Sequence, residues 1–395
     1  MNAKIDDGST WINDEKRRAF LTAIAGGERG GTLHPSAQTK APTTRRFKSA
    51  LGVAVFILFF ALSVVNNNKA LRSLSQLLNA DVHSELSAHP ALDPERTDCS
   101  YLLKKFKADE IEEAKREGEV NFRRSFVTIT KDVPHPFYVS THDKQIDRVR
   151  ASIMTHHMYY ESALTSLIAD TFVKARDEGR EAIFLDVGAN IGWFSLVAAA
   201  HGASKVYSFE PNLQNTIRFC ESLRLNGWAD GDLVVPVTKG VGRVEERREL
   251  RASPKNLNNP GAYSFNKDGP VVAVMNITTL DLFSERHGWF DLRPSIGCFK
   301  LDVEYFEQEV IEGAEKLLKS RIIEMIAMEL KPDHTEDAKL KICTILMDAG
   351  YELVMHGASK GPNKVVGKKY QHPSDLVKDF QGGMYKENVL FRLKK

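Results

Sequence analysis

The chain has 395 residues, which is enough for one large domain or two ordinary ones with a sizeable core. Its composition, 42% hydrophobic and 27% charged, is ordinary for a globular protein. The 54 basic and 52 acidic residues leave a formal net charge of only +2, so the chain lacks the broad positive field that binds nucleic acid. We therefore expect no nucleic-acid partner.

One apolar segment differs from the rest of the chain. Ser49–Val65 has 17 residues without a single charge. As a helix it would span roughly 26 Å, slightly less than a hydrocarbon core of about 30 Å. Lys48 and the polar run 66–69 can complete the crossing at the interfaces. A buried core helix would normally carry a polar face, so we predict a transmembrane helix over residues 48–66.

The flanks of this segment predict its orientation. A cleaved signal peptide would begin much nearer Met1, so we predict a single-pass signal anchor. Basic residues favour the cytoplasmic side, which places the N-terminus in the cytoplasm and everything after Val65 in the lumen or outside the cell. The basic residues are Lys40, Arg45, Arg46 and Lys48 before the segment, and Lys69 and Arg72 after it.

Composition divides the remainder. Residues 1–47 are rich in Gly, Thr, Ser and Pro and are predicted to be a disordered cytoplasmic tail. Residues 67–120 have helical patterns with a dense Lys and Glu content, so we interpret them as a helical stem. From about residue 121 strands alternate with helices, and residues 121–395 are predicted to be one folded domain.

The alternation predicts an α/β fold with a parallel or mixed sheet covered by helices on both faces. The predicted strands are Ala182–Val187, Lys205–Phe209, Leu233–Val237, Gly297–Val303, Ile322–Glu329, Tyr351–Met355 and Val389–Leu393. The predicted helices are Met158–Asp177, Trp193–His201, Leu213–Asn226, Phe306–Lys319 and Asp337–Ala349.

A glycine-containing turn follows the first of these strands. The strand ends in Asp186, and Gly188, Asn190 and Gly192 precede a helix. Glycine permits positive φ and lets a ligand approach the backbone, and the N–H groups at a helix start favour a carboxylate. Asp186 could hold an amino group directly or through water. The pattern predicts a nucleotide-type cofactor site.

The next strand ends in a second acid, Glu210, 24 residues after Asp186. That spacing suits a carboxylate that binds both ribose hydroxyls, in NAD as well as in S-adenosylmethionine (SAM). The loop here is G-x-N-x-G rather than the G-x-G-x-x-G turn that a pyrophosphate requires, so SAM is favoured. The alternative is a doubly wound sheet with turn carboxylates and no ligand.

These motifs resemble the FkbM-type methyltransferase family over roughly residues 145–394. The resemblance implies a class I fold, SAM as donor and, typically, O-methylation of a hydroxyl on a sugar or small molecule. It also places Glu161 in the cofactor site, because Tyr159-Tyr160-Glu161 is similar to a family motif. The other matching segments are Phe184–Gly192, Phe209–Asn212, Ile277–Asp281, Phe299–Glu304, Glu307–Ala314, the strand ending in Glu329, and Glu387–Phe391.

The candidate catalytic residues lie on the strand that ends near residue 303. Lys300, Asp302 and Glu304 share one face of it, since successive side chains alternate. Asp302 or Glu304 could accept a hydroxyl proton, and Lys300 could hold the base or lower the pKa of the incoming hydroxyl. The alternative is a structural lysine–carboxylate cluster at the edge of the sheet.

The chain departs from the family pattern at Tyr305, where relatives usually have glycine. If the backbone needs positive φ there, tyrosine costs on the order of 1–2 kcal/mol. If it does not, the phenol would fill part of the acceptor pocket. Two alternatives to O-methylation therefore stay open: a non-catalytic binding module with the same fold, and an N-methyltransferase.

Four cysteines, Cys99, Cys220, Cys298 and Cys343, are far apart and lack zinc-site spacing. They are either small buried core residues or form one or two disulfides, which would require an oxidising compartment.

Three further features are less specific. His156 and His157 could serve as bases or acceptor ligands but could equally be structural. Asn276 begins a glycosylation sequon that falls in a predicted strand. Residues 357–387 are polar and are predicted to form a long loop, either a lid or variable surface.

Overall fold

The computed structural model describes residues 96–106, 126–130, 135–142, 149–150, 160–254, 257, 259–357, 364–366, 368–381 and 388–394. The predicted tail 1–47, the predicted membrane helix 48–66 and most of the predicted stem lie outside these ranges. Within them, no helix combines the length and hydropathy needed to span a membrane.

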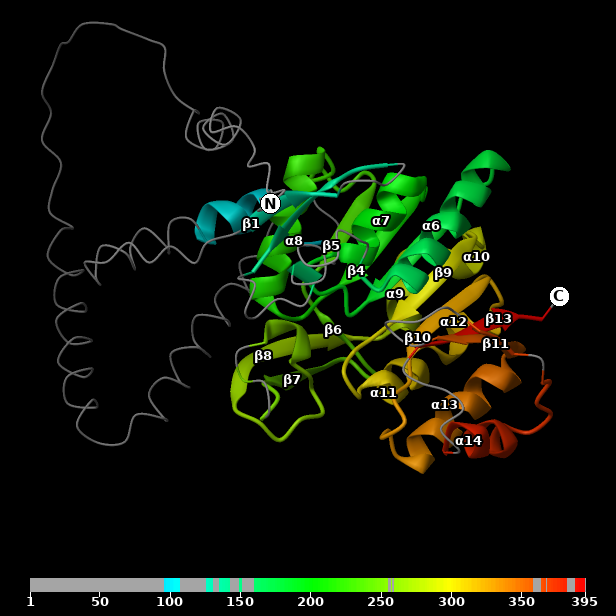
Figure 1. Cartoon of the computed structure of the whole chain (residues 1–395). Coiled ribbons are helices and arrows are strands. Elements are labelled where there is room, and N and C mark those ends of the chain that lie inside the picture. The colour runs from blue at the N-terminus through cyan, green and yellow to red at the C-terminus, as the bar shows by residue number, and fades with distance from the viewer. Residues whose placement is uncertain are drawn as a thin grey trace, which may run out of the picture. The chain divides into compact units, whose positions relative to one another are not determined.

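The domain is built on one mixed sheet of eight strands (Figure 1). Its order is β12-β11-β13-β10-β9-β3-β4-β5, with β5, β4, β3, β9 and β10 parallel and β13 antiparallel to both neighbours. The bounds are β3 Ile183–Val187, β4 Lys205–Phe209, β5 Val234–Val237, β9 Ile296–Leu301, β10 Met325–Glu329, β11 Tyr351–Gly357, β12 Lys364–Val365 and β13 Asn388–Leu393. This order places the ends of β3, β4 and β9 side by side.

Helices cover both faces because the inner strands are apolar on both sides, as in β9, where every residue is buried. One face packs on α6 (Ser162–Asp177), α7 (Trp193–His201) and α8 (Leu213–Asn226). The other packs on α9 (Leu280–Arg286), α10 (Trp289–Leu292), α11 (Glu307–Glu312), α12 (Glu315–Lys319), α13 (Glu336–Asp348) and α14 (Pro373–Gln381). The predicted α/β sheet covered by helices on both faces is therefore confirmed.

A second, three-stranded sheet follows β5 and was not foreseen as a unit. It consists of β6 (Gly240–Val241), β8 (Val271–Thr278) and β7 (Glu246–Arg251) in that order. The excursion between β7 and β8 contains the short helix η1 (Pro260–Ala262). In Figure 1 the β7–β8 hairpin projects away from the central sheet.

The described N-terminal residues pack on the same domain. Residues 99–106 are helical, and Cys99 and Leu102 are buried in the core beside α8. The hairpin of β1 (Phe126–Ile129) and β2 (Tyr138–Thr141) also contacts α8. Thus residues 96–106, which fall within the predicted stem, are attached to the folded domain.

The cysteines divide between the two expected states. Cys99 and Cys220 form a disulfide across 121 positions of sequence. Cys298 and Cys343 are free thiols buried in the core. One disulfide is therefore present, and the other two cysteines act as small apolar core residues.

Two predicted elements differ from those observed. The helix expected over Phe306–Lys319 is divided into α11 and α12, with Gly313 and Ala314 between them. At Gly313 the backbone passes so close to Gly242 that a Cβ would lie 2.0 Å from the Gly242 carbonyl oxygen. The loop expected over 357–387 contains β12 and α14, whose buried face (Leu376, Val377 and Phe380) packs in the core.

Candidate functional site

The turn between β3 and α7 requires its glycines. Gly188 has φ of 82°, and a Cβ there would lie 1.8 Å from the carbonyl oxygen of Asp302. Gly192 has φ of 85°, and a Cβ there would lie 2.0 Å from the ring of Phe219. Asn190 also has positive φ, 54°, which asparagine tolerates better than most residues. The turn therefore brings the backbone against β9 on one side and α8 on the other.

Glu210 lies directly beyond β4 and is held by the turn. Its two carboxylate oxygens accept hydrogen bonds from Asn190 N (2.7 Å) and Asn212 N (2.8 Å), and Asn215 Nδ2 is 3.3 Å from one of them. Burial raises the pKa of Glu210 to about 7 although these donors lower it. The carboxyl group is thus fixed in orientation and titrates near neutral pH.

Asp186 and Lys300 form a buried pair beneath the turn. Lys300 Nζ donates to the carbonyl oxygen of Gly188 at 2.7 Å and lies 3.5 Å from Asp186 Oδ1. Ser195 donates to the other carboxylate oxygen, Oδ2, at 2.6 Å. Burial raises the pKa of Asp186, although Lys300 lowers it. Burial alone would lower the pKa of Lys300, but Asp302 and Asp186 raise it, so the lysine is a charged support for the turn.

A pocket opens above these residues at the ends of β3, β4 and β9. It brings together five of the predicted site residues, Gly188, Asn190, Glu210, Asp302 and Glu304. Asp186, Gly192, Lys300 and Glu161 do not line it, so they contribute from beneath or beside it. Further parts of the wall come from Asn215 of α8, from Lys239 and β6 (Gly240 and Val241), and from Pro260, Gly261, Tyr263, Ser264 and Phe265 of the β7–β8 excursion.

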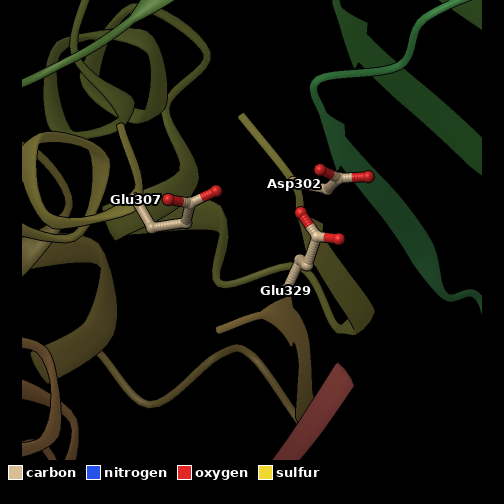
Figure 2. A group of neighbouring side chains, drawn as sticks. All are labelled: Asp302, Glu307 and Glu329. Carbon is tan, nitrogen blue, oxygen red and sulfur yellow. The ribbon is translucent and has the colours of Figure 1, made fainter. Parts of the chain in front are cut away.

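Carboxyl groups gather beside the pocket at the ends of β9 and β10 and at the start of α11. Oxygens of Asp302, Glu307 and Glu329 lie within 4.8 Å of one another, and Figure 2 shows the first and last side by side. Each has a partner within the protein. Lys300 is 3.6 Å from Asp302, Lys331 is 2.8 Å from Glu329, and Val303 N (3.0 Å) and His334 Nε2 (2.8 Å) bind Glu307. Each carboxyl group of the cluster therefore has a donor or a lysine ammonium group beside it.

Burial and the charge of Asp302 shift the pKa values of two neighbouring carboxyl groups, Glu329 and Glu161. Burial, and then the charge of Asp302, raise the pKa of Glu329 well above its usual range. Burial and Asp302 likewise raise the pKa of Glu161, at the start of α6, to about 7, and Asn388 Nδ2 lies 3.3 Å from its carboxylate. Of Asp302, Glu329 and Glu161, only Asp302 lines the pocket. The other two carboxyl groups, whose pKa values are raised, lie near it.

The turn after Asp302 has an unusual backbone. Glu304 and Tyr305 have φ of 56° and 74°, both in the left-handed region. Side chains hold them there: Ser264 Oγ donates to Glu304 O at 2.6 Å, and Asn266 Nδ2 donates to Tyr305 O at 3.0 Å. The position does need positive φ, so the tyrosine at this place is strained.

The Tyr305 side chain contacts Asp333, Lys331 and Lys267, none of which lines the pocket. Its hydroxyl donates to Asp333 Oδ2 at 2.8 Å, and the ammonium groups of Lys331 and Lys267 lie 4.9 and 5.4 Å from its ring centroid. Both lysines also bind Glu304 Oε2, at 3.2 and 3.0 Å. Glu304 therefore has two lysine ammonium groups on its carboxylate, whereas Asp302 has one beside it.

Sequence reasoning did not identify Lys267, Lys331 and Ser264 as site residues. They come from the β7–β8 excursion and from the turn after β10, and no motif marks them. The only sequence signal near them is the strand ending in Glu329, which matches the family motif.

The less specific predictions fare differently. His156 and His157 lie outside the described residues. Asn276 is half-buried in β8, the middle strand of the small sheet, and the sequon residue Thr278 is fully buried.

One family model matches part of the chain. The family model described as methyltransferase FkbM domain matches residues 186–353, which include Asp186, Glu210, Asp302 and Glu329. No curated protein matches the chain.

Solved structures give more distant likenesses. A Streptococcus mutans structure described as a SAM-dependent methyltransferase is 11% identical, with 73% of this chain and 66% of that chain covered and a TM-score of 0.34. The SAM-dependent methyltransferase from Agrobacterium tumefaciens is 9% identical, with 70% of this chain and 72% of that chain covered and a TM-score of 0.35. Precorrin-6y C5,15-methyltransferase from Geobacter metallireducens is 12% identical, with 59% of this chain and 88% of that chain covered and a TM-score of 0.28.

All these TM-scores are below 0.5. On the basis of the family match, the chain carries a methyltransferase FkbM domain over residues 186–353.

Proposed function

We propose that this protein transfers the methyl group of SAM to a hydroxyl group of a glycan or small molecule, and that residues 48–66 anchor it in a membrane of the secretory pathway. The observation that carries the catalytic part is the placement of Asp302. It lines the same pocket as Glu210 and abuts the cofactor turn at Gly188.

The residues around the turn fit SAM. Glu210 presents a carboxylate, already oriented by two backbone N–H groups, that can accept from both ribose hydroxyls. Asp186 Oδ1 accepts no hydrogen bond among the described residues and has only its ion pair with Lys300 at 3.5 Å, which leaves an acceptor beneath the turn for the amino group, directly or through water. The start of α7 and the positive-φ glycines suit the carboxylate.

The acceptor side needs a proton acceptor and exact alignment more than any other catalytic device. SAM supplies an activated methyl group on a sulfonium, so proximity to the nucleophile accounts for most of the rate. Asp302 accepts the hydroxyl proton, while Lys300, 3.6 Å away, holds this carboxylate in place. Glu304, bound by two lysines, shapes the wall instead.

The structure also bears on the non-catalytic alternative. Tyr305 would support it if the phenol blocked the pocket. Among the described residues that line the pocket, Glu304 and Phe306 are present and Tyr305 is not. We therefore favour an active enzyme. A carboxylate-lined pocket suits an amine as well as a hydroxyl, so N-methylation is an outcome to be distinguished by experiment.

Methyl transfer can be measured with radiolabelled SAM and the full chain in detergent. Acceptors should include neutral monosaccharides, oligosaccharides, simple phenols and matched amines. We expect label on a hydroxyl acceptor, and a loss of about 100-fold or more in Asp302→Asn without loss of binding of S-adenosylhomocysteine (SAH). Label on amines alone would establish N-methylation, and SAH binding without transfer to any acceptor would support the non-catalytic alternative.

The location is a separate part of the proposal. The apolar segment 49–65 and its flanking charges support a lumenal domain, and the disulfide Cys99–Cys220 suits an oxidising compartment. In sealed microsomes, added protease should remove residues 1–47 and leave the domain intact. Digestion of the domain with protection of the N-terminus would reverse the topology.

A further inference from the structure

Helix α8 is the element through which the N-terminal part of the chain reaches the cofactor pocket. On its inner side, Asn215 Nδ2 contacts Glu210 Oε1 at 3.3 Å, and Thr216 Oγ1 lies 3.2 Å from the Glu210 carbonyl oxygen. One turn further, the ring of Phe219 fills the space in front of Gly192. A displacement of α8 would therefore move Glu210 and the cofactor turn together.

Residues 96–106, which we call the N-terminal clamp, are fastened to this same helix. Cys99 is joined by the disulfide to Cys220, the residue after Phe219. Arg218 lies over the ring of Phe106, 5.5 Å from its centroid. Cys99 and Cys220 are both buried, so the attachment belongs to the core.

The clamp also holds the end of β5. Thr97 N donates to Pro236 O at 2.8 Å, and Thr97 Oγ1 accepts from Thr238 N at 2.9 Å. The two threonine hydroxyls are 2.6 Å apart. The next residues, Lys239 and Gly240, line the pocket. The clamp thus fixes two walls of the pocket, one through α8 and one through β5.

We propose that the N-terminal clamp is a positioning element of the cofactor pocket, and that the domain binds SAM and SAH tightly only while Cys99–Cys220 is intact. This inference rests on the proposed use of the pocket for SAM. Because disulfides persist in oxidising compartments, the clamp would confine tight cofactor binding to copies of the chain that have matured there. Thr97 and Cys99 act through Thr238 and α8, so they are positioning residues.

The test is calorimetric titration of SAH into the full chain in detergent. The double variant Cys99→Ser/Cys220→Ser should bind SAH about tenfold more weakly at unchanged stoichiometry. Thr97→Val keeps the disulfide but removes both contacts to Thr238, and should weaken binding about threefold. Ser100→Ala, an exposed position on the same segment, should leave SAH affinity unchanged.

A second control separates positioning from general loss of stability. Leu353→Ala removes a buried side chain in β11, in the core on the other face of the sheet from α8, and should lower Tm without weakening SAH binding. If this variant weakens SAH binding as much as the cysteine variant does, the clamp has no specific role.

The remaining outcomes separate this inference from the proposed function. Unchanged SAH affinity in both the cysteine variant and Thr97→Val would overturn the clamp and leave the cofactor pocket standing. If the cysteine variant does not fold, Thr97→Val against Ser100→Ala decides the question alone. Failure of the unmodified chain to bind SAH would overturn the cofactor assignment itself, and the clamp with it.

Discussion

The two sides of the pocket reach similar backbone conformations by different means. On the cofactor side, positive φ occurs at Gly188, Asn190 and Gly192, residues that adopt it at low cost, and backbone N–H groups orient Glu210. On the acceptor side, positive φ occurs at Glu304 and Tyr305, where it strains the backbone. Side chains from the β7–β8 excursion and from the turn after β10 hold these two residues in place.

The difference indicates how each side can vary. On the cofactor side, the orientation of Glu210 depends on backbone N–H groups of the neighbouring turns. The acceptor side depends on contacts among the Glu304–Tyr305 turn, the β7–β8 excursion and the turn after β10. Substitutions in any of these segments can reshape it. We therefore expect substitutions on the cofactor side to affect SAH binding more than substitutions on the acceptor side.

The largest effect is expected for Gly188→Ala. The new Cβ would lie 1.8 Å from the Asp302 carbonyl oxygen, a backbone atom that cannot rotate away, so the turn must move. SAH affinity should fall by about 100-fold or more, with a stability loss of about 3 kcal/mol. Gly179→Ala is the matched control, because Gly179 has φ of 65° and nothing within 4 Å of a Cβ. It should lose only about 1 kcal/mol and keep its SAH affinity. Equal losses in both variants would contradict the contact argument.

Glu210→Gln should weaken SAH binding by about 30-fold, because the amide has one acceptor oxygen where the carboxylate has two for the backbone donors and the ribose. In the unmodified chain SAH affinity should also rise as pH increases through about 7, since the ionised form of Glu210 is the better acceptor. This rise should be absent in Glu210→Gln. The same pH dependence in both proteins would remove Glu210 from the cofactor site.

Stability should change with pH in the opposite direction. Glu210 has its pKa raised by burial from 4.5 to about 7, so between these values the folded protein binds more protons than the unfolded chain. The free energy of unfolding should therefore fall as pH rises from about 4.5 to 7, and Glu161 should contribute in the same sense. Urea titrations of Glu210→Gln should show a shallower fall, by on the order of 1–3 kcal/mol across this range. An identical fall in both proteins would show that burial does not raise the pKa of Glu210.

The smallest effect is expected at Tyr305. Tyr305→Gly removes the ring contacts and the bond to Asp333 but relieves the φ of 74°, so its stability should lie within about 1 kcal/mol of the unmodified chain. Tyr305→Ala loses the contacts and keeps the strain, and should be less stable than the glycine variant by about 1–2 kcal/mol. SAH affinity should be retained in both. A glycine variant no more stable than the alanine variant would mean that the turn is not strained.

The same contrast explains how much the sequence could predict. The strands β3, β4, β9 and β13 and the helices α7 and α8 follow from hydrophobic period and from Gly, Asp and Asn at their ends, and the predicted bounds agree to within about two residues. Asp186 and Glu210 were located because they terminate adjacent strands. These signals are local, so a single sequence carries them.

The acceptor side and the clamp could not be located in this way. Lys267 and Lys331 meet on Glu304 from segments 64 residues apart, and Cys99 joins Cys220 across 121 positions. Tertiary packing alone decides such contacts. The strain at Tyr305 was foreseen only as one of two possibilities, because the sign of φ depends on what holds the turn.

The most direct test of the cofactor site is competitive titration of the full chain in detergent with SAH and with NAD. We predict one SAH site with a Kd of about 1–100 μM and no NAD binding in the same range. NAD binding without SAH binding, or binding of neither, would contradict the assignment of Gly188–Gly192 and Glu210 to SAM.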